Sequence, residues 1–177
     1  MGKIIKAIVL SLLLIQCSTE TDKTIAKNKL GEIGPKTSIE DLDVLFKNDS
    51  ITKIPVDADF IREYHVYDEE GNELLTIKPK YEKDSIIGIE FIKVYNDSYK
   101  TESGISTLST YKDLADNYSI DKIEPSFNSA IVFVDELNAT FALDKKDLKL
   151  GEFDMRKIRK DQIPDMARIQ YITLWFE

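Results

Sequence analysis

The sequence is poor in the residues that build disulfides, zinc sites and nucleophilic triads. It contains one cysteine and one histidine among its 177 residues. No disulfide can form within the chain, because that bond joins two cysteines. A zinc site needs three or four cysteine, histidine or carboxylate ligands, so zinc is not expected. We therefore predict neither a metal nor a cofactor.

Glycine and basic residues are scarce as well. The seven glycines form neither a Walker sequence nor a dinucleotide-binding pattern. The 24 lysines and arginines are outnumbered by 32 aspartates and glutamates, which gives a formal net charge of −8. Binding to nucleic acid needs clustered basic residues that contact phosphates, so no nucleic acid partner is expected. The overall charge also argues against electrostatic binding to anionic lipid.

The N-terminal residues have the order of a bacterial signal peptide. Lys3 and Lys6 make the first six residues basic, and residues 7–15 are apolar except for one serine. This run is too short for a membrane-spanning helix, which needs about 20 residues, but it has the length of a signal-peptide core. It ends at Cys17, and the sequence beyond is polar.

The tetrapeptide Leu14-Ile15-Gln16-Cys17 resembles the lipobox of bacterial lipoprotein precursors. Gln16 stands where a small residue is usual, and relaxed lipoboxes of this kind are similar to those of Bacteroidetes lipoproteins. The resemblance implies that residues 1–16 are removed and that Cys17 carries lipid, such as palmitate. It implies a location in the cell envelope, anchored at the outer membrane. The alternative is an ordinary or uncleaved signal peptide with a chance cysteine.

The mature chain is expected to be a tether followed by one globular domain. Residues 17–29 comprise the lipidated cysteine and a polar stretch, which predicts a flexible tether. Residues 30–177 form a single domain. Its expected parts are a first repeat at about 34–80, a linking strand at 85–95, a second repeat at about 104–148 and a closing strand at 168–176. Residues 151–161 are polar and basic and are expected to be an irregular connection.

Each repeat begins with the signature of a helix N-terminus. A hydroxyl residue is followed three positions later by an aspartate, as in Ser38 with Asp41 and in Thr110 with Asp113. Two strand-like runs around an acidic turn follow each helix, at 60–77 and at 130–143, which is typical of a hairpin. The predicted fold class is therefore α+β. Two helix-plus-β-hairpin repeats would share one largely antiparallel sheet, with the short helices packed on one face.

The domain also resembles a class of uncharacterised bacterial lipoproteins. The residues that carry this resemblance are Tyr99-Lys100-Thr101, Gly104-Ile105, Ser109-Thr110, Asp113-Leu114, Tyr118 and Ile163-Pro164-Asp165. In architecture alone, the repeat is similar to small envelope domains of the outer-membrane assembly lipoprotein and beta-lactamase-inhibitor-protein type. Neither resemblance implies catalytic residues, and a fold alone does not determine a function.

Three groups of residues are candidate sites. His65 shares a strand face with Tyr67 and is expected to be structural or exposed, because no nucleophile motif accompanies it. The acidic turn at 68–73 could bind calcium but lacks the spacing of an EF-hand loop, which favours a solvated hairpin tip. Ile169, Tyr171, Thr173 and Trp175 share one face of the closing strand. Of these, Tyr171 and Trp175 could line a peptide or glycan groove, although core packing is the simpler interpretation.

Taken together, these features predict a membrane-anchored, non-enzymatic binding or assembly module of the envelope. Its partners would be the membrane, through the lipid on Cys17, and another envelope protein or a glycan. The alternative is an envelope enzyme that acts on glycan or peptide through a carboxylate pair. No catalytic residue is assigned, and Cys17 is the single residue given a defined role.

Overall fold

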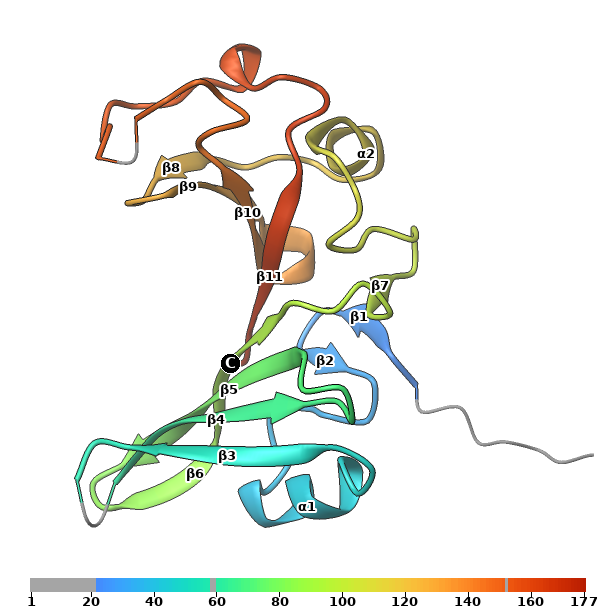
Figure 1. The fold of residues 1–177 in the computed structure, drawn as a ribbon, viewed down its shortest axis with the longest axis vertical. Coiled ribbons are helices and arrows are strands. Elements are labelled where there is room, and N and C mark those ends of the chain that lie inside the picture. Colours follow the sequence, from blue (N-terminus) through green and yellow to red (C-terminus); the bar gives the residue numbers. More distant parts are fainter. Residues whose placement is uncertain (1–21, 58–59, 152) are drawn as a thin grey trace, which may run out of the picture.

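A computed structural model describes residues 22–57, 60–151 and 153–177, and its main feature is a large antiparallel sheet (Figure 1). Every neighbouring pair of strands in this sheet runs antiparallel. In spatial order its eight strands are β3 (Ser50–Pro55), β4 (Ile61–Tyr67), β5 (Glu73–Glu82), β6 (Ser85–Val94), β11 (Ile169–Trp175), β10 (Ala139–Asp144), β9 (Ser129–Val134) and β8 (Ile123–Pro125).

A second, small sheet has the order β2 (Lys29–Leu30), β1 (Thr24–Ala26) and β7 (Lys100–Thr101). Strand β1 runs parallel to β7, and the amide of Lys100 donates to the carbonyl of Lys23. Ile25 of β1 is fully buried. The flexible tether expected up to residue 29 is therefore wrong from residue 24 onward, because β1 pairs both with β2 and with β7, whose partner residues lie 76 positions later in the chain.

The helical segments are short. They are the 3-10 turn η1 (Ile39–Asp41), α1 (Leu42–Leu45), α2 (Tyr111–Asn117), η2 (Asp135–Leu137) and η3 (Lys160–Gln162). Both predicted capping boxes are confirmed: Ser38 caps η1 together with Asp41, and Thr110 caps α2 together with Asp113. No helix within the described ranges is long and apolar enough to cross a membrane.

The predicted α+β fold of two helix-plus-hairpin repeats is wrong. Strands account for 42% of the described residues and helical residues for 13%, so the fold is mostly β. The physical reason lies in the apolar stripe at residues 39–46. That stripe has helical spacing, but Phe46 already leaves the helix with φ of −110° and ψ of 37°. The single larger helix, α2, has seven residues, and one eight-stranded sheet dominates the described chain.

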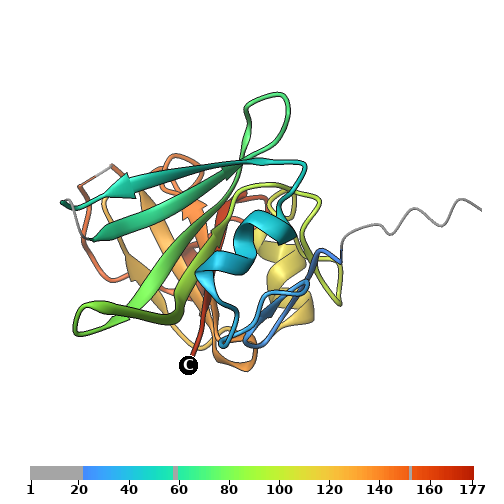
Figure 2. The same ribbon diagram turned by 90° about the horizontal axis from the view of Figure 1, so that it is seen from below.

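One face of the large sheet holds the core. The row of register partners that crosses all eight strands on this face is entirely apolar: Ile51, Val66, Leu75, Val94, Ile172, Phe141, Val132 and Ile123. Leu42 of α1, Leu114 of α2 and Ile25 of the small sheet belong to the same buried cluster. In both views these covering elements lie on the right of the molecule (Figures 1 and 2).

The closing strand β11 lies inside the sheet, between β6 and β10. A bulge opposite Ala142 and Leu143 changes the register, so that Ile169 pairs with Leu143 and is buried in the core. Simple alternation predicted that Ile169 and Tyr171 share one face of the strand. Because of the bulge they lie on opposite faces, and that prediction is wrong for Ile169. The two edges of the sheet are protected against further pairing, because β3 ends at Pro55 and the three-residue β8 ends at Pro125.

Candidate functional site

The side of the large sheet that faces away from the core carries a mixture of threonine, lysine and aromatic residues, and we call it the open face. Its central row follows the register across seven strands: Thr52, His65, Thr76, Lys93, Thr173, Thr140 and Phe133. Aromatic residues flank this row, with Phe91 and Trp175 on one side and Tyr67, Tyr95 and Tyr171 on the other. Strand alternation puts all of these side chains on one surface.

The centre of the open face is organised around Lys93. Its ammonium lies 5.7 Å from the ring centre of Phe91 and 5.6 Å from that of Tyr171. Phe91 contacts Trp175 edge to face at 5.2 Å between ring centres. No carboxylate of the described residues forms an ion pair with Lys93, so its charge is balanced by ring faces and solvent. The arrangement presents a half-buried cation beside the buried ring of Phe91 and the half-buried ring of Tyr171, and the neighbouring Thr76, Thr140 and Thr173 are buried as well.

His65 is tied to two glutamates on the same face. Its Nδ1 lies 2.7 Å from Glu73 Oε1, and its Nε2 lies 3.5 Å from Glu63 Oε2. The hydroxyl of Thr76 donates to the same Glu73 oxygen at 2.7 Å. The hydroxyl proton is therefore directed to the carboxylate and not to the imidazole, which is not the geometry of a nucleophile and its base. His65 stacks on Tyr67 as the strand pattern predicted.

In the acidic turn between β4 and β5, the carboxylate oxygens of Asp68 accept hydrogen bonds from within the turn itself. Asp68 accepts from the amide of Asn72 at 2.7 Å and from its side chain at 3.0 Å, and these bonds lower the pKa of Asp68. Gly71 adopts a φ of +84°, which the tight turn requires. Across the described residues, no group of three histidine, cysteine or acidic side chains is placed to hold a metal ion. Calcium binding at this turn therefore has no geometric support.

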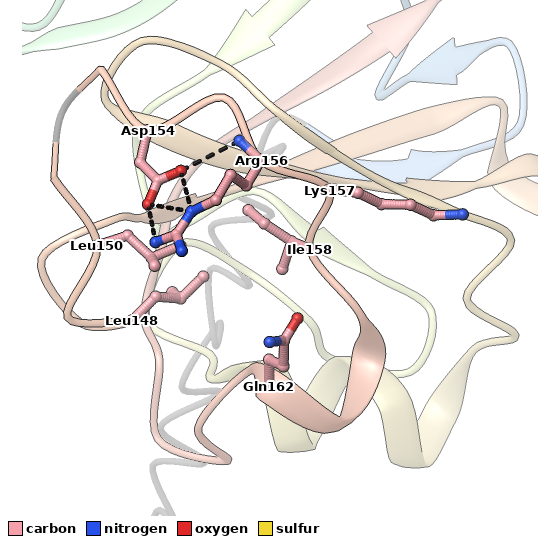
Figure 3. Close-up of a pocket in the computed structure, with 7 residues that line it drawn as sticks. All are labelled: Leu148, Leu150, Asp154, Arg156, Lys157, Ile158 and Gln162. Carbon is pink, nitrogen blue, oxygen red and sulfur yellow. Dashed lines mark hydrogen bonds and ion pairs between the residues drawn. The ribbon is translucent and has the colours of Figure 1, made fainter.

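The connection between β10 and β11 contains a cavity of about 260 Å³ (Figure 3). Leu148, Leu150 and Ile158 line it, and Asp154 pairs with Arg156 at 2.6 Å, which lowers the pKa of Asp154 to about 2. Small-molecule sites usually measure about 300–1,000 Å³, so this cavity is slightly small for one. In Figure 3 the Lys157 side chain extends away from the other lining residues.

The residue assigned from the sequence, Cys17, lies outside the described residues. Tyr171 and Trp175, the candidate groove residues, lie on the open face, where Tyr171 is half-buried and Trp175 is exposed. Sequence reasoning missed Lys93 and Phe91. Their alternation in the strand 85–95 was visible, but their position beside Tyr171 and Trp175 depends on the pairing of β6 with β11.

Comparison with known proteins adds a fold likeness. No family model and no curated protein matches the sequence. The fold is similar to the crystal structure of the uncharacterized protein yfeY from Escherichia coli, with a TM-score of 0.58 and 12% sequence identity. The match covers 87% of this chain and 99% of that chain. At this identity the likeness concerns the fold alone.

Proposed function

We propose that this protein is a lipid-anchored, non-enzymatic binding module of the bacterial envelope, held at the outer membrane through Cys17, and that the open face is its binding surface. The observation that carries the proposal is the contact of the Lys93 ammonium with the rings of Phe91 and Tyr171. Aromatic side chains concentrate binding energy at protein interfaces, and a cation among them adds specificity.

An envelope protein suits this surface better than a glycan. Sugar rings stack on free aromatic faces, whereas Lys93 already lies over the rings of Phe91 and Tyr171. A second ammonium, that of Lys78, lies 5.5 Å from the Phe91 ring centre. The Lys78 ammonium already pairs with Glu90 at 3.6 Å, so the Lys93 ammonium is the group that is complementary to an acidic side chain beside an apolar one, which a protein partner can present.

The geometry gives less support to the alternative of a carboxylate-based enzyme. Glu63 and Glu73 flank His65, and Glu73 also accepts a hydrogen bond from Thr76. A general acid requires a carboxyl whose pKa is raised, and burial raises the pKa of Asp49, which lies at the turn before β3 and close to Tyr99; no ion pair or hydrogen bond among the described residues joins Asp49 to His65. These contacts favour a binding function over a carboxylate-based enzyme.

The anchor and the surface are tested separately. Cys17→Ser should move the protein from the detergent phase to the aqueous phase in a phase-partition experiment, because acyl chains contribute about 0.8 kcal/mol per buried methylene. Partition of this variant with the membrane fraction, as for wild type, would contradict the anchor.

The surface is tested by affinity purification of the lipidated protein from its native envelope, followed by mass spectrometry. Partners recovered by wild type should be lost with Lys93→Glu, which reverses the charge at the centre of the open face. Lys47→Glu makes the same charge change at an exposed position in the turn after α1 and should leave recovery unchanged. Equal recovery by Lys93→Glu and wild type would exclude the open face as the binding surface.

A further inference from the structure

The connection between β10 and β11 has a charge opposite to that of the whole protein. Residues 145–160, which we call the basic loop, contain seven basic and three acidic residues in a chain with a net charge of −8. Lys146, Lys149 and Lys157 are exposed, and none of them forms an ion pair or side-chain hydrogen bond within the described chain. The net negative charge of the chain argued against contact with anionic lipid, but the local charge of the basic loop is positive, so that argument does not apply to this surface.

The same loop exposes large apolar side chains. Phe153 is 75% exposed and Met155 is 57% exposed. Phe127, from the turn between β8 and β9, is 69% exposed and contacts Phe153 edge to face, with 5.9 Å between ring centres. Soluble proteins seldom leave such side chains clustered in water, and clusters of this kind mark a surface that contacts a partner or a membrane.

A fully buried lysine holds this cluster in place. The Lys145 ammonium donates to the carbonyl of Phe127 at 3.2 Å and to that of Asp154 at 2.6 Å. These two carbonyls belong to the two segments that carry the exposed phenylalanines. Burying an ammonium is costly unless it is fully hydrogen-bonded, so the lysine fixes both backbones. The aromatic pair is therefore preorganised and is not a product of two mobile loops.

We propose that the basic loop, together with Phe127, binds the surface of an anionic lipid membrane. Phenylalanine and methionine side chains enter the boundary between headgroups and acyl chains, while lysine and arginine side chains extend to the phosphates. Charge and apolar exposure coincide here, which favours a lipid surface over an uncharged apolar groove in a protein. The loop lies on the opposite side of the molecule from β1, where the described chain begins (Figures 1 and 2). It is thus a contact separate from the N-terminal lipid.

The test uses the chain from residue 17 with Cys17→Ser, which lacks lipid but keeps every described element of the fold. It is mixed with vesicles of phosphatidylcholine containing phosphatidylglycerol, and the bound fraction is measured by co-sedimentation. We expect binding that weakens as salt is raised and that drops at least about tenfold on pure phosphatidylcholine vesicles. Absence of binding to the anionic vesicles, or equal binding to both kinds, would overturn the proposal.

Matched variants assign any binding to the loop. Phe127→Ser with Phe153→Ser should abolish vesicle binding, and Lys146→Glu with Lys157→Glu should weaken it about tenfold or more. Val44→Ser, at another exposed apolar residue, and Lys47→Glu should bind as wild type does. All six positions are exposed, so circular dichroism should show each variant folded. If Val44→Ser loses as much binding as the double phenylalanine variant, the loop is not the contact. Protein capture by the loop without any vesicle binding would also refute a lipid surface.

Discussion

At the scale of single residues, a buried tyrosine makes the free energy of unfolding fall at alkaline pH. Tyr99 is 5% exposed, and burial, with a smaller contribution from the charge of Asp49, raises its pKa to about 12. Folding therefore favours the neutral phenol. The resulting stability is complete below the unfolded pKa of about 10 and is lost as the pH rises from there through 12.

Tyr99→Phe should remove this alkaline sensitivity. At a pH of about 11, wild type should have lost about 1.4 kcal/mol that the variant keeps, because only the unfolded tyrosine is then mostly ionised. Urea unfolding at pH values of about 8 and 11 measures the difference. At the lower pH the two midpoints should agree, since the phenol is neutral in both states. Equal losses in both proteins at the higher pH would show that Tyr99 is not responsible.

At the scale of elements, the N-terminus of α2 is where the helix joins the closing strand. The amides of Tyr111 and Lys112 donate to the carbonyls of Ala167 and Asp165, at 2.8 Å and 2.9 Å. The Thr110 hydroxyl accepts from the amide of Asp113. The free amides that every helix N-terminus leaves are thus satisfied by a side chain and by the segment that leads into β11.

Thr110→Ala should destabilise the protein by about 1 kcal/mol, the usual cost of removing an N-cap hydroxyl. Thr110→Ser keeps the oxygen and should retain most of that stability. Chemical denaturation monitored by circular dichroism compares the three proteins. A loss of the same size for serine and alanine would mean that the methyl group matters here and that the cap does not.

Local elements were predictable and distant pairings were not. Both caps and the strands around 61–67, 85–94 and 169–175 were visible, because alternation and capping are encoded by neighbouring residues. The pairing of β1 with β7 was missed, since strands of two or three residues have no measurable period. The open face could be predicted only in part. Alternation within one strand placed His65 with Tyr67, whereas Lys93 lies beside Tyr171 because of the order of the strands, which the sequence did not reveal.

At the scale of the whole molecule, stability depends on the last strand. Strand β11 pairs with both β6 and β10, and its Ile172 and Leu174 are fully buried. Ile169 and Phe176, at its two ends, are buried as well. Each buried side chain of this kind contributes about 1.5–3 kcal/mol, against a net stability of about 5–15 kcal/mol for a domain. Among the described strands of the large sheet, β3 to β6 and β8 to β10 are joined by strand pairing only through β11.

Deleting residues 168–177 should abolish cooperative unfolding. Thermal melting followed by circular dichroism should show a gradual slope in place of a transition. Removing residues 1–16, which precede the described chain, is the control and should leave the melting temperature unchanged. By contrast, a deletion that reaches residues 24–30 should destabilise, because Ile25 and Leu30 are buried. A truncated protein that still melts sharply near the wild-type temperature would show that β11 is dispensable.

Because β11 lies in the middle of the sheet but at the end of the sequence, the sheet can be completed only late in synthesis. Ribosomes make about 5–20 residues per second, so roughly 4–16 s separate the completion of β6 from that of β11. During that interval β6 is an edge strand without its neighbour, and β10 is one as well from its own completion until β11 is made; such edges invite pairing with other chains. The large sheet cannot be completed until β11 has been synthesised. A premature stop codon near the end of the reading frame would then release a product prone to aggregation, not a shortened working protein.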